Sequence, residues 1–124
     1  MVLDASAVLA LLFREPGCEE VSRVIGDAAL SSVNLAEVVS KLAERGDDVD
    51  AACFKIARLG IDIIAFDTAQ ARETALLYQA TRKHGLSLGD RACLALGRRL
   101  GRLVLTADRI WAEADTGVEV RVIR

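Results

Sequence analysis

The sequence predicts an α/β fold in which helices cover both faces of a short, mostly parallel five-stranded sheet, a three-layer α/β/α sandwich. Three observations predict this class. Short apolar segments alternate with longer helical segments along the chain. The helical segments begin at capping residues, and several are followed by glycine. The length of 124 residues, 52 % of them hydrophobic, is that of a single domain spanning 1–124. We expect the crossovers to be right-handed.

The first half of the chain alternates two strands with four helices. The first helix ends at the turn Glu15-Pro16-Gly17, since proline and glycine interrupt helices. Asn34 and Glu37 have the spacing of a capping box, so we expect a helix to begin with Asn34 in the cap position. Gly46 follows that helix. The elements predicted here are strands over 2–4 and 29–31 and helices over 5–12, 18–27, 34–45 and 49–59.

The second half continues the alternation and ends in a strand. The β-branched run Ile61-Asp62-Ile63-Ile64 is typical of a strand. Asp67 and Gln70 form one capping-box pattern, and Ser87 and Asp90 form another. The elements predicted here are strands over 61–66, 103–105 and 118–123 and helices over 67–83, 87–100 and 108–114.

Four acidic residues fall at one edge of the predicted sheet. Asp4 and Asp108 directly follow predicted strands. Glu37 lies early in the helix that follows the second strand, and Asp90 lies in the first turn of the helix that precedes the fourth strand. Strands and helices run in opposite directions in such folds, so these positions meet at the carboxyl edge, where α/β sheets place their sites. We expect the Asp4, Asp90 and Asp108 carboxylates to lie close enough to share one or two cations.

A divalent cation would offset the repulsion among these carboxylates. Mg²⁺ and Mn²⁺ prefer oxygen ligands, and a cation held this way supports hydrolysis of a phosphodiester. Each acid taken alone also has a structural explanation as a helix cap, and only their coincidence at one edge favours a site. Arg91 and Arg109 stand beside two of the acids and suit phosphate contact.

Composition bears on phosphate binding, on the state of the cysteines and on membrane insertion. The net charge is −2, so phosphate binding depends on local arginines rather than a global field. Cys18, Cys53 and Cys93 are odd in number and widely spaced, which indicates free thiols and a cytoplasmic location; we expect Cys53 and Cys93 to be buried. No apolar run is long enough to span a membrane, and no signal peptide is expected.

Four motifs occur in a familiar order: Asp4-Ala-Ser6-Ala, Asn34-Leu-Ala-Glu37, Leu86-Ser87-Leu-Gly-Asp90-Arg91 and Leu105-Thr106-Ala-Asp108-Arg-x-Trp111. Together they resemble the PIN-domain ribonucleases, and more closely the VapC toxins of VapBC toxin–antitoxin pairs. The resemblance implies a Mg²⁺- or Mn²⁺-dependent endoribonuclease, a homodimer, an RNA substrate and inhibition by a VapB-type antitoxin.

By position, the acids of that family correspond to Asp4, Glu37, Asp90 and Asp108, which the resemblance makes both catalytic and metal-binding. It implies that Ser6 and Thr106 support these acids or position the substrate. Asn34 has a structural role in this interpretation. The alternative function is a catalytically silent PIN-like domain that binds RNA or protein. Other α/β phosphate enzymes are disfavoured, because Ser6 stands where a dehalogenase-type phosphatase has its second Asp and no Gly-x-Gly-x-x-Gly follows the first strand.

Overall fold

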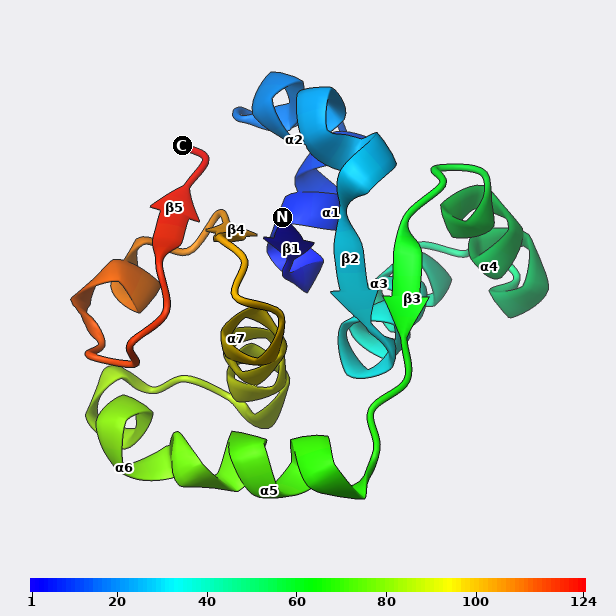
Figure 1. Cartoon of the computed structure of the whole chain (residues 1–124). Helices are drawn as coiled ribbons and strands as arrows, with labels where there is room; N and C mark the ends of the chain where they lie inside the picture. Colours follow the sequence, from blue (N-terminus) through cyan, green and yellow to red (C-terminus); the bar gives the residue numbers. More distant parts are fainter.

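A computed structural model describes all residues, 1–124, and its five strands form one fully parallel sheet (Figure 1). The strand order is β3-β2-β1-β4-β5, so the first strand lies at the centre. The chain builds β1, β2 and β3 to one side and then returns to add β4 and β5 on the other. The strand order therefore reverses between β1 and β4, and such a switch point is where parallel sheets bind ligands. The strands are β1 (Val2–Leu3), β2 (Ala29–Ser31), β3 (Asp62–Ile64), β4 (Val104–Thr106) and β5 (Val120–Val122).

Helices cover both faces of this sheet, which confirms the three-layer prediction. Figure 1 shows α1 and α2 on one side of the central strands and α5, α6 and α7 on the other. The helices are α1 (Ala5–Leu12), α2 (Cys18–Val24), α3 (Ser32–Glu44), α4 (Val49–Ala57), α5 (Thr68–Leu76), α6 (Tyr78–Thr81) and α7 (Leu88–Leu100), with 3₁₀ turns at Ile25–Asp27, Arg82–His84 and Arg109–Glu113.

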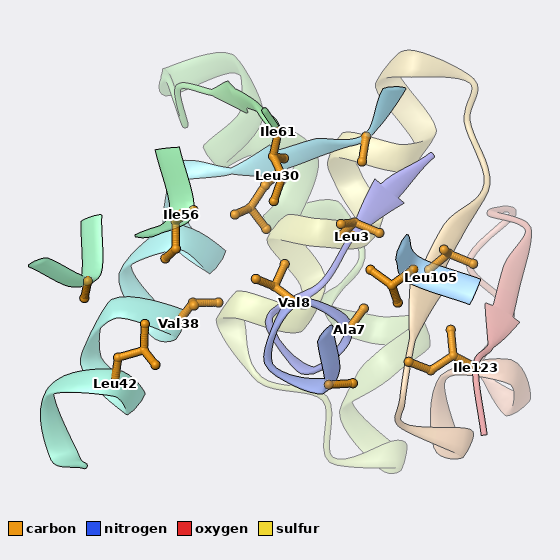
Figure 2. Packing of buried hydrophobic residues seen from close by; sticks show 14 residues of the cluster. Leu3, Ala7, Val8, Leu30, Val38, Leu42, Ile56, Ile61, Leu105 and Ile123 are labelled. Carbon is orange, nitrogen blue, oxygen red and sulfur yellow. The ribbon is translucent and has the colours of Figure 1, made fainter. Parts of the chain in front are cut away.

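Alternation along the strands divides the interior into two cores. Successive strand residues point to opposite faces, so Leu3, Leu30 and Leu105 pack with the helices α1 to α4, as Figure 2 shows. Their neighbours in the strands face α7 and the segment before it, in a second core that contains Trp111, Leu94 and Leu96. Each large side chain buried in this way contributes about 1.5–3 kcal/mol, so the two cores fix the central strands firmly.

Several predicted boundaries were wrong in detail. The helix predicted over 67–83 is divided at Leu77, which ends α5 with a turn-like ψ of −6°. The Thr81 hydroxyl donates a hydrogen bond to the Leu77 carbonyl oxygen at 2.7 Å, and such bonds compete with the regular helix ladder. The helix predicted over 18–27 finishes in a 3₁₀ turn from Ile25 onward, and the strands predicted over 61–66 and 118–123 are shorter.

The cysteines differ in their surroundings. All three are free thiols; Cys93 is buried in α7 as predicted, whereas the prediction that Cys53 is buried was wrong. The buried residues of α4 are Ala52 and Ile56, and Cys53 lies about 100° around the helix from Ala52, outside this buried stripe. None of the helices is both long and apolar enough for a membrane span.

Candidate functional site

Asp4 lies at the switch point, immediately after the central strand β1. Its backbone N–H donates to the Leu105 carbonyl oxygen of β4 at 3.1 Å, and its side chain is only 4 % exposed. The Asp4 carboxylate also caps α1 by accepting the Ala7 N–H at 2.8 Å. We call the carboxyl edge of the sheet that carries Asp4, Glu37, Asp90 and Asp108 the rim. The buried Asp4 carboxylate caps α1 and also belongs to the rim, so the structural explanation and the site explanation of Asp4 are compatible.

Ser6 and Thr106 hold the Asp4 carboxylate in place. The Ser6 hydroxyl lies 2.7 and 2.8 Å from the two Asp4 carboxylate oxygens, and the Thr106 hydroxyl donates to Oδ2 at 2.7 Å. Each hydroxyl also accepts a backbone N–H, Ser6 from Ala107 at 2.9 Å and Thr106 from Asp108 at 3.0 Å. The two hydroxyls thus connect the loop after β4 to Asp4.

Asp90 lies in the first turn of α7, where the predicted capping box is formed. Asp90 Oδ2 accepts the Ser87 N–H at 2.9 Å, and the Ser87 hydroxyl accepts the Asp90 N–H at 3.2 Å. This box fixes the start of α7 and with it the position of Asp90. It does not remove Asp90 from the rim, because the Asp90 carboxylate still lies close enough to Asp4, Glu37 and Asp108 to interact with each electrostatically.

Glu37 reaches the same region from α3, but the predicted start of that helix was wrong. Ser31 is the N-cap and accepts the Val33 N–H at 3.2 Å, so α3 begins earlier than Asn34. Ser31 is the last residue of β2, and its hydroxyl caps the N–H of Val33 in the first turn, so Asn34 lies inside the helix. Asn34 is buried, and its Nδ2 donates to Glu37 Oε1 at 2.7 Å and to the Gly89 carbonyl oxygen at 3.0 Å. Sequence reasoning missed this contact between α3 and α7.

Asp108 and the two arginines complete the rim. Asp108 is exposed and caps the following 3₁₀ turn by accepting the Ile110 N–H at 3.1 Å. Arg91 forms no ion pair, and its guanidinium carbon lies 5.2 Å from the centre of the Tyr78 ring. Arg109 is exposed and donates to the Arg124 carbonyl oxygen at 3.1 Å. Neither Arg91 nor Arg109 forms an ion pair with a carboxylate, and the guanidinium of Arg109 is engaged by a backbone carbonyl.

Burial raises the pKa of Asp4, Glu37 and Asp90. The pKa of Asp4 rises from its ordinary value of 3.8 to about 6, chiefly because the carboxylate is out of water, and Asp90 adds to the rise. The hydrogen bonds from Thr106, Ala7 and Ser6 oppose it. Burial likewise raises the pKa of Glu37 and of Asp90, and repulsion between the acids contributes to both. The rim is thus an electrostatically costly cluster centred on Asp90.

No three His, Cys, Asp or Glu side chains are arranged so that they could hold a metal ion as they lie. The expectation that Asp4, Asp90 and Asp108 already lie close enough to share a cation is therefore not met. The reason is local: Asp90 bonds to its own helix cap and Asp108 to its own turn. The donor set nevertheless fits a hard cation, because it consists of carboxylate oxygens whose mutual repulsion a positive ion would offset.

Comparisons with known proteins agree with this fold. The chain has no match among curated protein sequences. Its structure is similar to a toxin–antitoxin complex from Klebsiella pneumoniae, with 16 % identity, a TM-score of 0.77 and coverage of 99 % of this chain and 97 % of that one. DNA-bound VapBC from Salmonella typhimurium is 15 % identical, with a TM-score of 0.75 and coverage of 99 % of this chain and 97 % of that one. FitAcB from Neisseria gonorrhoeae is 20 % identical, with a TM-score of 0.73 and coverage of 98 % of this chain and 96 % of that one.

The family itself is shown by sequence. The family model described as the PIN domain matches residues 1–117, which is nearly the whole chain and includes all four acids of the rim. The fold predicted from strand and helix alternation, the parallel sheet and the structural neighbours are all consistent with this match. This chain belongs to the PIN domain family.

Proposed function

We propose that this protein is a Mg²⁺- or Mn²⁺-dependent endoribonuclease that acts as the toxin of a type II toxin–antitoxin pair. One observation carries the proposal: the carboxylate of the buried Asp4, a residue only 4 % exposed, is held by two hydroxyls at the switch point of the sheet, beside three further acids. Burying a carboxylate in this way costs stability, as the raised pKa of Asp4 indicates. A domain that only binds RNA or protein gains nothing from that cost, so the arrangement favours catalysis over the silent alternative.

The residues have separate roles in this proposal. Asp4, Glu37, Asp90 and Asp108 would hold the cation, which supplies a water of lowered pKa and offsets charge on the phosphate. Ser6 and Thr106 keep the Asp4 carboxylate aimed into the site and accept the N–H groups of the loop that carries Asp108. Arg91, which no acid pairs, is placed to contact a phosphate of the RNA through its planar donors.

The toxin role rests on the neighbours and on the family. Structures described as toxin–antitoxin or VapBC complexes superimpose over nearly the whole of this chain. We infer that the partner is a VapB-type antitoxin and that the chain forms a homodimer. Expression of the protein alone should arrest growth, and co-expression of the small protein encoded beside it should relieve the arrest. Arrest that an Asp90→Asn variant causes equally would contradict the catalytic explanation.

The enzymatic test uses single-stranded RNA and the full chain. We expect cleavage with Mg²⁺ or Mn²⁺, none with EDTA, and at least about 100-fold less with Asp90→Asn, since ligand removal is more severe than loss of a supporting residue. Asp67→Asn is the matched control, because Asp67 also follows a strand and caps a helix but lies away from the rim. RNA binding without cleavage, equal in wild type and Asp90→Asn, would favour the silent binding domain.

A further inference from the structure

Asn34 is a buried amide with an unusual set of partners. It is 1 % exposed, and both of its hydrogen bonds leave from Nδ2, one to the Glu37 carboxylate in its own helix and one to the Gly89 carbonyl oxygen in α7. Its Oδ1 is buried without a partner. An unpartnered buried oxygen is costly, and an apolar residue would avoid the cost. An apolar residue at this position would also leave the Glu37 carboxylate without its Nδ2 donor.

Gly89 lies on the other side of the same carboxylate. A Cβ atom at Gly89 would come within 2.6 Å of the Glu37 carboxyl carbon, much closer than side-chain atoms approach one another. Gly89 needs no special backbone conformation, and glycine weakens a helix relative to alanine. The absence of a side chain at Gly89 therefore serves to make room for the Glu37 carboxylate.

We propose that Asn34 and Gly89 form a clamp that fixes the Glu37 carboxylate beside Asp90. Asn34 donates to the carboxylate from α3 and to the backbone of α7, and Gly89 leaves the space the carboxylate occupies, one residue before Asp90. The clamp sets the separation between two acids of the rim that come from different helices. Asn34 is thus a positioning residue, and this inference rests on the proposed metal-dependent function.

The clamp predicts which substitutions weaken metal binding. Asn34→Ala removes the donor, and Gly89→Ala displaces the carboxylate, whose atoms are the nearest that the added Cβ would meet. Loss of residues that orient metal ligands typically costs 10–100-fold in affinity, so each variant of the full chain should bind Mn²⁺ at least about 10-fold more weakly than wild type, measured by titration with electron paramagnetic resonance. Mn²⁺ affinity within about twofold of wild type in both variants would overturn the proposal.

Matched controls separate positioning from general damage. Gln70 is another buried amide with a single Nε2 hydrogen bond, to the Ala65 carbonyl oxygen, and an unpartnered Oε1. Gly26 has nothing within 4 Å of where its Cβ would be. Gln70→Ala and Gly26→Ala should leave Mn²⁺ affinity unchanged. An equal loss of affinity in Gln70→Ala would show that Asn34→Ala acts through stability, and the clamp would be rejected.

A double-mutant cycle tests whether Asn34 acts through Glu37. If it does, Asn34→Ala should change Mn²⁺ affinity less than about twofold in a Glu37→Gln background, because there is no longer a carboxylate to position. The same 10-fold loss in both backgrounds would contradict the clamp.

A metal-free measurement keeps the proposed function and the clamp distinguishable. The side-chain amide resonance of Asn34 should be shifted by Glu37→Gln and by Gly89→Ala in the absence of any metal. If wild type binds no Mn²⁺, the proposed function fails and this resonance alone decides the clamp. A resonance unchanged by both substitutions would overturn it.

Discussion

Replacing Asp4 by Asn tests the electrostatic cost of the rim, because Asp4 is the most buried of the four acids. The asparagine side chain has nearly the same shape as the aspartate side chain but carries no charge. The wild-type pKa of about 6 in the folded protein, against the ordinary 3.8, means that ionising Asp4 at neutral pH costs about 3 kcal/mol of folding free energy, at 1.36 kcal/mol per pH unit. Removing the charge removes that cost in the metal-free protein.

Part of this gain is offset by hydrogen bonding. Ser6, Thr106 and Ala7 all donate to the carboxylate, and the asparagine side chain presents an NH₂ group where one of them expects an acceptor. One mismatched donor costs about 1 kcal/mol. We therefore expect metal-free Asp4→Asn to be about 2 kcal/mol more stable than wild type at pH 7.5.

The pH dependence has a definite sign. Between about pH 4 and pH 6 the folded wild type binds the Asp4 proton more tightly than the unfolded chain does, so its stability falls as pH rises through this window and levels off above it. The variant lacks this contribution, and the shifts at Glu37 and Asp90 occur in both proteins and largely cancel. The stability difference should therefore shrink by about 2.4 kcal/mol from pH 7.5 to pH 4, where the unfolded carboxyl is still partly ionised, leaving the variant slightly less stable at pH 4.

Urea unfolding at several pH values, with EDTA and at fixed ionic strength, measures this difference. Asp67→Asn is the control, because Asp67 is an exposed cap and asparagine caps helices about as well as aspartate. A stability difference between wild type and Asp4→Asn that does not change with pH would refute the argument that burial of a charge makes the rim costly.

Three further substitutions test other parts of the structure. Thr106→Val should cost about 1–3 kcal/mol in urea unfolding, because both Asp4 and the Asp108 N–H lose a buried partner; an unchanged midpoint would argue against the hydroxyl connection. Gly97→Ala should cost about 1–3 kcal/mol in thermal unfolding, because its Cβ would collide with the Val104 side chain, and a stabilised variant would contradict this packing. Glu73→Gln should change stability by less than about 1 kcal/mol, since its ion pair with Arg99 is partly exposed, and a larger loss would mean that the pair is stronger than its surroundings suggest.

The elements that sequence reasoning predicted well are those with strong local signals. The short apolar run that ends at Leu3, followed by Asp4, predicts the strand β1 and the acid after it. The spacing of Ser87 and Asp90 predicts the capping box that they form. These patterns depend only on residues that are close together in the sequence, so the elements that they predict do not depend on tertiary contacts. They were enough to predict the parallel sheet, but not the geometry of the acids, no three of which are arranged to hold a metal ion as they lie.

The features that sequence reasoning missed depend on tertiary contacts. Asn34 resembles a helix cap in sequence, but Ser31 occupies that position, and nothing local reveals that Asn34 reaches across to Gly89. The break at Leu77 has no proline or glycine to signal it. The exposure of Cys53 follows from which face of α4 meets the core, a choice made by packing rather than by composition.

The most direct test of the account is where a divalent cation binds. Crystals of the full chain grown with Mn²⁺ would give an anomalous peak that marks the ion. We predict one or two peaks with carboxylate oxygens of at least two of Asp4, Glu37, Asp90 and Asp108 at ligand distance. A peak elsewhere on the molecule, or none at Mn²⁺ concentrations that support RNA cleavage, would contradict the claim that the four acids form one cation-dependent site.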